Sequence, residues 1–507
     1  MFNINKLHFV TSGIIGVSIS FLSNFSMAQT ANERLAICNN DPRVITGQVS
    51  AEVCAGADIF FRATFDGNGR TCGTCHRAED NFTISPEFIT TLPDNDALFV
   101  AEHNPDLSTL ERPEILREFA MIVENVDGQD DLDNKFTLRS IQHTLSLATS
   151  LSVSDGDGTT TPPLERTGWS GDGAPNDGTL RDFLTGAVTQ HFTADLNRTP
   201  GSSFTLPNDQ ELDLTLAYQL ELGRTNDIDL NELELADAGA QAGIATFQGV
   251  GRCNTCHLNA GANFILDGNN RNFDTGVESI RLLDVDLALT PSDGGFGHEG
   301  SDTDGDGIDD IFGDGTFNST PLIEAADTGP FFHTNAFSTL EEAVAFYTTD
   351  EFNSSPGGLG GDPVVLTNDE IDNVARLLRV LNTAFNIDIA LQRLNSAVEL
   401  FTDSNRREFR GRFSPTQLED VTTDLAQYSF FELEDAIQVL RGAPNTLHPV
   451  AQRQLDNAIR EVNLAIRAPS ENSRVTALNN AVRFATQARE ELGEGIDYTL
   501  GTGNIIR

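Results

Sequence analysis

The chain has 507 residues, of which 39% are hydrophobic, and its 76 acidic residues outweigh 32 basic ones to give a formal net charge of −44 at pH 7. This length allows about three domains, each with its own core. The negative charge excludes a general attraction to nucleic acid or anionic lipid and favours a basic partner, although a solvated acidic surface explains it equally well.

Residues 1–28 have the pattern of a secretory signal peptide. One basic residue, Lys6, precedes an apolar run around Ile14–Val17, and small residues lead to a cleavage site after Ala28. The run is short for a membrane span, so an uncleaved anchor is the less favoured alternative. We expect a periplasmic or secreted protein whose mature chain has no membrane span.

The pentapeptide Cys-x-x-Cys-His occurs twice in the chain, which is the pattern of c-type haem attachment. Two thiols one helical turn apart reach the two vinyl groups of a porphyrin, and the next histidine presents a ring nitrogen to the iron. A structural zinc site or a thioredoxin-like pair are alternatives, but zinc needs four ligands from neighbouring pairs and these pairs are far apart. The sequence therefore predicts two covalently bound haems, held by Cys72, Cys75 and His76 and by Cys253, Cys256 and His257.

The two remaining cysteines, Cys38 and Cys54, lie before the first motif. In an oxidising compartment they would form a disulfide that closes a short loop.

The first motif follows a short amphipathic helix that ends near 57–61 and a turn-rich segment at 65–69. Residues 95–150 are predicted to be helical segments interrupted by prolines. Residues 152–178 are rich in Gly, Asp, Thr and Pro and are predicted to be a loop. This loop contains the only tryptophan, Trp169. A tryptophan in such a loop is most often a residue that anchors the loop by packing.

A helix is expected over 179–193, where it ends in Gln190-His191-Phe192. Residues 238–247 then repeat the arrangement of a helix before a motif. We therefore expect two modules, 29–230 and 231–390, each mainly helical with long loops.

The acidic segment 302–310 resembles the first half of a calcium-binding loop. Carboxylates at positions 1, 3 and 5 precede a glycine at position 6, but position 12 is Gly313 rather than the usual glutamate. A calcium ion and a solvated acidic loop are both compatible with this pattern. The predicted ligands are Asp302, Asp304, Asp306 and Asp310.

Two capping boxes predict helix starts, one at Thr339 with Glu342 and one at Thr367 with Glu370. In the first helix Tyr347 shares a face with apolar residues, a position that usually belongs to the core. The second helix has a strongly amphipathic stripe from Ile371 to Phe385.

Residues 391–507 differ from the rest of the chain because glycine becomes rare and apolar stripes recur at helical spacing. They predict a helical-bundle extension without metal ligands. The expected fold class is mainly α: two cytochrome c-like haem domains and this C-terminal extension.

With these motifs placed, residues 50–390 resemble the bacterial di-haem cytochrome c peroxidase and MauG family. The resemblance depends on the two Cys-x-x-Cys-His motifs, the tryptophan loop between them, and Gly329–His333 followed by Leu340–Tyr347. It implies that the first haem is the reactive centre, that the second transfers electrons, and that Trp169 is a relay between them. It also implies a calcium ion near the domain interface.

Two departures from the family pattern concern the iron pockets. Where peroxidases of the family place a methionine ligand on the second haem, this chain has Tyr347, as MauG-like members do, so Tyr347 is a predicted iron ligand. Where the family has a catalytic glutamate, this chain has Gln190 and His191. His191 is a candidate for acid–base work, Gln190 only for hydrogen bonding, and either could be structural. His103 and His143 are weaker candidates for a sixth ligand of the first haem.

The leading functional prediction is an oxidoreductase that reduces hydrogen peroxide with electrons from a small, basic donor protein. A MauG-like or rubber-oxygenase-like oxidase acting on a larger substrate is the alternative favoured by Tyr347 and the missing glutamate. A non-catalytic electron-transfer cytochrome is the third alternative, and it requires both irons to be fully ligated by the protein.

Overall fold

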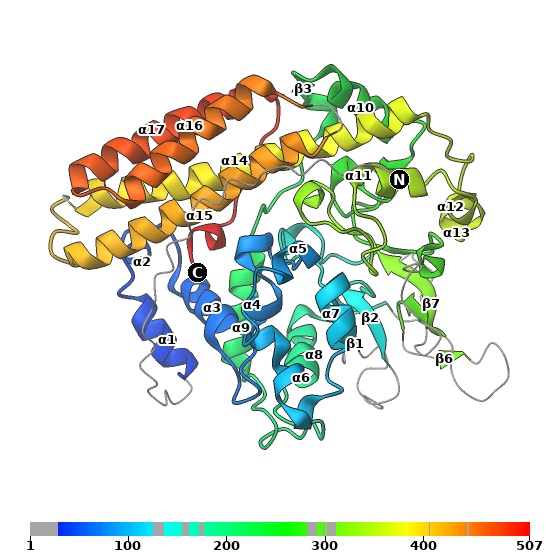
Figure 1. The fold of residues 1–507 in the computed structure, drawn as a ribbon, viewed down its shortest axis with the longest axis horizontal. Coiled ribbons are helices and arrows are strands. Elements are labelled where there is room, and N and C mark those ends of the chain that lie inside the picture. Colours follow the sequence, from blue (N-terminus) through cyan, green and yellow to red (C-terminus); the bar gives the residue numbers. More distant parts are fainter. Residues whose placement is uncertain are drawn as a thin grey trace, which may run out of the picture.

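The computed structural model describes residues 29–124, 136–154, 162–171, 177–280, 292–297, 300–301, 311–404, 406–443 and 446–507. Helices dominate these residues and the sheets are small, which confirms the mainly α expectation (Figure 1). Within these ranges, no helix has both the length and the apolar character that crossing a membrane requires. The predicted signal peptide, residues 1–28, lies outside the described residues.

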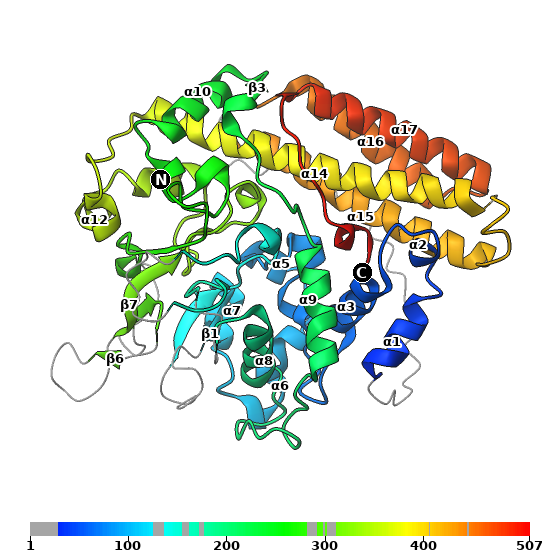
Figure 2. The same ribbon diagram turned by 180° about the vertical axis from the view of Figure 1, so that it is seen from behind.

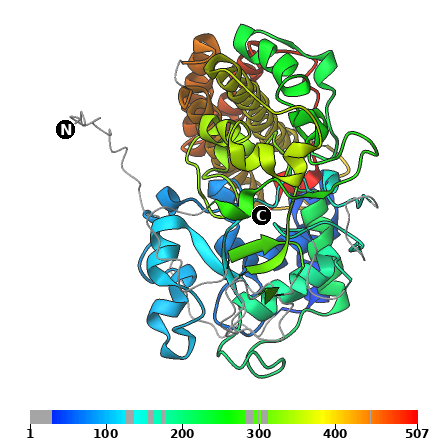
Figure 3. The same cartoon turned by 90° about the vertical axis from the view of Figure 1, so that its right-hand side faces the viewer.

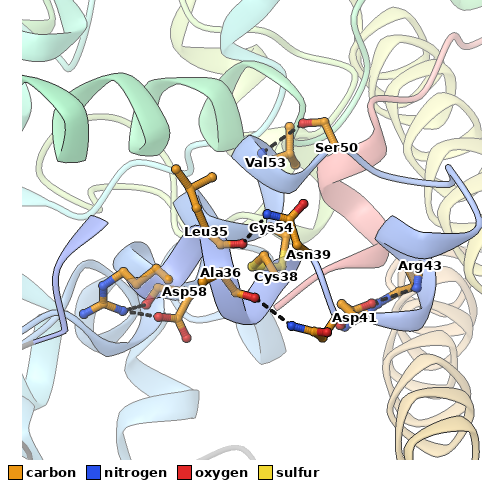
Figure 4. The surroundings of a disulfide bond; sticks show 12 residues. Leu35, Ala36, Cys38, Asn39, Asp41, Arg43, Ser50, Val53, Cys54 and Asp58 are labelled. Carbon is orange, nitrogen blue, oxygen red and sulfur yellow. Dashed lines mark hydrogen bonds and ion pairs between the residues drawn. A yellow bond between two sulfur atoms is a disulfide. The ribbon is translucent and has the colours of Figure 1, made fainter. Parts of the chain in front are cut away.

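The N-terminal segment is fastened by the predicted disulfide. Cys38 ends α1 (Ala31–Cys38) and bonds Cys54 in α3 (Ala51–Arg62), with Cα atoms 5.8 Å apart (Figure 4). Ser50 caps α3 by accepting a hydrogen bond from the Val53 amide, which defines where this helix begins. The short α2 (Pro42–Ile45) lies in the loop that the disulfide closes.

The first module continues through short helices and one antiparallel strand pair, in which Glu124 at the end of β1 is opposite Thr137 of β2. The helix α9 packs against α3 and is seen beside it from behind (Figure 2). The elements are α4 (Cys72–Cys75), α5 (Pro86–Ile89), α6 (Val100–His103), α7 (Pro113–Phe119), β1 (Met121–Glu124), β2 (Thr137–Ser140), α8 (Leu180–His191) and α9 (Asp209–Leu220).

The second module has α10 before its motif and a small sheet after it, in which β7 pairs with β4, β5 and β6. The predicted capping box at Thr339 and Glu342 is present at the start of α11. The elements are β3 (Glu234–Leu235), α10 (Ala238–Gln248), β4 (Asn272–Phe273), β5 (Ser292–Gly295), β6 (Gly300–Ser301), β7 (Ile311–Asn318), α11 (Leu340–Phe346), α12 (Asp350–Ser354) and α13 (Pro356–Leu359).

Four long helices lie side by side along one edge of the molecule, with both modules against them (Figures 1 and 3). They are α14 (Asn368–Ser404), α15 (Pro415–Arg441), α16 (Pro449–Ile466) and α17 (Glu471–Glu490). The capping pair Thr367 and Glu370 forms as predicted. The stripe on α14 is buried at Val374, Leu378, Leu381 and Phe385.

The expected boundary between residues 390 and 391 falls inside α14, which is one continuous helix. Its residues remain buried across this point because α14 packs against α10 and α11 as well as against α15 and α17. After α17, the strand β8 (Gly493–Glu494) pairs with β3, and the Gly501 amide donates to the Gly223 carbonyl oxygen. The C-terminal helices are thus joined to both modules.

Candidate functional site

The first Cys-x-x-Cys-His motif forms a single helical turn, α4, packed against the end of α3. The His76 amide donates to the Cys72 carbonyl oxygen at 2.9 Å, which places both thiols and the imidazole on one short turn. Gly73 is needed here because a Cβ atom at this position would lie 2.5 Å from Cδ1 of Phe61 on α3. Cys72, Cys75 and His76 all line one cavity, which we call the first cavity.

The second motif is arranged in the same way after α10. Cys253–Thr255 form a 3-10 turn, and the His257 amide donates to the Cys253 carbonyl oxygen at 2.9 Å. Cys253, Cys256 and His257 line a separate cavity, the second cavity. A single zinc ion would need both cysteine pairs in one coordination shell, whereas each pair here lines a cavity of its own.

Both motif histidines are oriented by a backbone carbonyl. Nδ1 of His76 lies 3.0 Å from the Phe82 oxygen, and Nδ1 of His257 lies 2.9 Å from the Thr320 oxygen. Since a carbonyl oxygen only accepts, Nδ1 carries the proton in each ring and Nε2 keeps the lone pair that a metal binds. Burial lowers the pKa of His76 to about 4 and also lowers that of His257, so both rings are neutral near pH 7.

The four motif cysteines are free thiols. Burial raises the pKa of Cys72, Cys253 and Cys256 to about 12 each, and it raises the pKa of Cys75 as well. Each thiol is therefore protonated at neutral pH. Paired thiols beside a neutral, pre-oriented imidazole in a largely apolar cavity are the residues that fit a covalently attached haem.

One wall separates the two cavities and contributes residues to both. Trp169 is part of it, and its indole N–H donates to the Ser140 carbonyl oxygen at 3.2 Å. The backbone of the tryptophan is held as well, because the Asn318 amide donates to its carbonyl oxygen at 2.9 Å. This shared wall consists of Ser140, Ile141, Gln142, His143, Trp169, Asn318, Ser319 and Pro321.

The predicted polar residues of the first cavity are placed differently from one another. His191, the last residue of α8, lines the cavity. Gln190 is buried, but it is not among the described residues that line this cavity. His143 is half-buried in the shared wall, and its buried Nδ1 has no hydrogen-bond partner among the described residues. His103 is exposed, contacts the Asp94 carbonyl oxygen and lines neither cavity in the part of the chain that is described.

Glu124 is a residue of the first cavity that the sequence did not reveal. It ends β1, lines the first cavity, and brings Oε2 within 3.6 Å of Nε2 of His191. The one local signal is a glutamate directly after the buried run Met121–Val123. Nothing in that run relates it to the motif or to the end of α8, so the carboxylate emerges only from the tertiary structure.

Tyr347, the predicted ligand, lines the second cavity at the end of α11. Its ring packs edge-on against Phe352 and Phe346, with centroids 4.9 and 5.4 Å away. Burial, and then the neighbouring Cys256 and Cys253, raise the pKa of the phenol above its ordinary value. His333 lines the same cavity and stacks on Phe317 at 4.3 Å, and burial lowers its pKa to about 4.

The predicted calcium ligands Asp302, Asp304, Asp306 and Asp310 lie outside the described residues, so calcium binding stays a prediction.

Comparison with known proteins assigns the chain to no family. No protein-family model and no curated protein matches the chain. The chain is similar to hydrazine synthase of Kuenenia stuttgartiensis, solved under 20 bar of xenon, at 14% identity over 74% of this chain and 99% of that chain. The TM-score is 0.37, a value too low to carry an argument about fold or activity.

Proposed function

We propose that this protein is an exported di-haem c-type oxidoreductase, related to the cytochrome c peroxidase and MauG family, that reduces hydrogen peroxide. The observation that supports this proposal is the pair of motif-lined cavities divided by one wall. Each cavity contains two half-buried thiols and one pre-oriented imidazole. Haem supplies one-electron redox chemistry and an iron that can bind peroxide.

The residues of each motif have defined roles in this proposal. Cys72 and Cys75 would attach one haem and Cys253 and Cys256 the other, while Nε2 of His76 and of His257 would bind the irons. The carbonyl groups that accept from Nδ1 keep the imidazole planes from rotating and make Nε2 a better donor. Neither ring has to lose a proton to bind near pH 7 because both are already neutral.

The shared wall provides the route between the two centres. Trp169 lines both cavities, and hydrogen bonds hold its indole and its backbone. A large aromatic ring held rigidly between two cavities is a suitable relay for electrons moving from the second centre to the first. The acidic surface of the chain favours a small, basic protein as the donor to the second centre.

Proton transfer in the first cavity falls to His191 in this proposal. Reduction of peroxide requires a group that takes a proton from one oxygen and returns it to the other. His191 lines the cavity and Gln190 does not, so His191 is the residue positioned for this work.

Tyr347 favours a second candidate, a MauG-like or rubber-oxygenase-like oxidase that acts on a larger substrate. The phenol lies in the same cavity as His257, and it would have to lose its proton to bind iron as phenolate. Phenolate stabilises oxidised iron. Such a ligand disfavours a second centre of high potential, which a simple peroxidase would use.

The deciding experiment combines spectroscopy with turnover on the purified holoprotein. Optical and EPR spectra are expected to show one high-spin and one low-spin haem, and peroxide is expected to be consumed with a reduced donor cytochrome. A stable oxidised product without turnover would favour the MauG-like candidate. Two low-spin haems in every redox state would contradict both enzymes and favour an electron-transfer cytochrome.

A further inference from the structure

The first cavity contains a histidine–carboxylate pair formed by two elements that are distant in the sequence. Nε2 of His191 and Oε2 of Glu124 are 3.6 Å apart, and the two side chains are only 12% and 21% exposed. This distance exceeds that of a hydrogen bond, so the attraction is electrostatic and becomes an ion pair when the imidazole takes up a proton.

The end of α8 that carries His191 is fixed to the loop before the first motif. The Asn68 side-chain amide donates to the His191 carbonyl oxygen at 2.9 Å, and the Asn68 backbone amide donates to the Phe192 oxygen at 2.8 Å. The chains approach so closely that a Cβ atom at Gly67 would lie 1.8 Å from the Phe192 oxygen. His191 is therefore held in a defined position relative to His76.

Glu124 is held by the strand pair of β1 and β2. It ends β1, whose residues Met121–Val123 are buried and paired with β2. The strand pair brings the carboxylate to the imidazole, while the Asn68 contacts bring the imidazole to the motif. The strand pair and the Asn68 hydrogen bonds thus fix the surroundings of His191 independently of each other.

We propose that Glu124 is a positioning residue that makes His191 the proton acceptor of the first cavity. The carboxylate holds the ring and stabilises the imidazolium that forms when a proton leaves an incoming ligand, as a carboxylate does for histidine in hydrolytic triads. For hydrogen cyanide as the probe, His191 would take the C–H proton, and the cyanide anion would be free to bind a ferric haem held by Cys72, Cys75 and His76. This inference rests on the proposed function, because it requires a haem with an open position in the first cavity.

The test measures cyanide association with the ferric holoprotein by stopped-flow at constant pH. Imidazole is the comparison ligand, because it binds iron without losing a proton. Glu124→Gln should slow cyanide association about 10-fold and His191→Gln about 100-fold, while imidazole binding changes less than about 2-fold. Glu124→Asp should recover part of the rate, and the double variant should match His191→Gln alone. Glu87→Gln, on an exposed residue of the same module, is the matched control.

The possible outcomes separate this inference from the proposed function. Unchanged cyanide kinetics in Glu124→Gln would overturn the inference and leave the function intact. An equal decrease in the association rates of cyanide and imidazole would overturn the inference, because it would show that Glu124 has only a structural role. Conversion of the first haem from low to high spin in His191→Gln would overturn the inference, because it would identify His191 as an iron ligand in the wild type. A wild-type protein with both haems that binds no cyanide would overturn the inference and the function together.

Discussion

The two cavities share their motif side and differ in the residues that face it. In each, a carbonyl-bound histidine and two half-buried thiols come from a single turn. The first cavity is also lined by charged and polar groups such as Glu124 and His191. The second presents aromatic groups, including Tyr347 and Phe352.

Under the proposed function, this difference means that the pentapeptide would decide where a haem is attached but not how that haem reacts. A cavity with an imidazole and a carboxylate can move protons, which peroxide chemistry needs. The second cavity is lined by aromatic rings, one phenol and also His333, which stacks on Phe317 and stays neutral near pH 7 because burial lowers its pKa to about 4. In the proposed function, the same five-residue motif would therefore serve two roles, set by the elements folded over it.

The largest expected effect comes from removing one cysteine pair at a time. Cys72→Ser with Cys75→Ser should leave one covalent haem and abolish cyanide binding, because the open position lies in the first cavity. Cys253→Ser with Cys256→Ser should also leave one haem but retain cyanide binding. Mass spectrometry of the denatured chain counts the haems and optical titration measures the binding. Two covalent haems in either variant would contradict the attachment sites.

Replacing Tyr347 by Phe tests whether this residue of the second cavity binds the iron. The change removes only the phenol oxygen, so the optical and EPR signals of the second haem should change while those of the first remain. Tyr428→Phe is the control, since Tyr428 is a tyrosine of α15 that is not among the described residues lining either cavity. Identical spectra for wild type and Tyr347→Phe would rule out ligation by this residue.

The disulfide between Cys38 and Cys54 lies in the first module alone. Replacing Cys38 and Cys54 by alanine should lower the free energy of unfolding by about 2–4 kcal/mol, because the cross-link restricts the unfolded chain. The signals of the first haem should be lost at lower denaturant concentration, since α3 packs directly against α4. Urea denaturation followed at each haem measures this. Equal shifts at both haems would show that the two regions unfold together.

The smallest effect concerns Asp327, which precedes a residue of the second cavity and accepts hydrogen bonds from Asn382 and Asn386 of α14. Burial raises the pKa of Asp327 to about 7, so the folded chain keeps a proton that the unfolded chain releases near pH 4. Its contribution to stability is complete below pH 4 and is lost as the pH rises through 7.

Asp327→Asn should therefore gain stability relative to wild type between pH 4 and 7, by about 1–3 kcal/mol. Urea denaturation at several pH values measures this difference. Asp420→Asn, on an exposed residue of α15, is the control. A difference between Asp327→Asn and wild type that does not vary with pH would contradict the buried, protonated carboxyl group.

Much of the local structure could be predicted because it depends on neighbouring residues. The capping boxes at Thr339 and Thr367, the stripe of α14 and the disulfide all form as expected. The continuity of α14 across residue 390 could not be predicted, because it depends on packing against both a module and the other long helices.

The sequence by itself determined where the two proposed haems would be attached, since the thiols and the histidine of each motif lie within five residues and one turn brings them together. Only the tertiary structure decided what faces each motif. Glu124 reaches His191 through a strand pair and a helix end, and Trp169 reaches both cavities through a wall built from three separate segments. Such contacts join residues with no shared local pattern, so they depend on the packing of the whole chain.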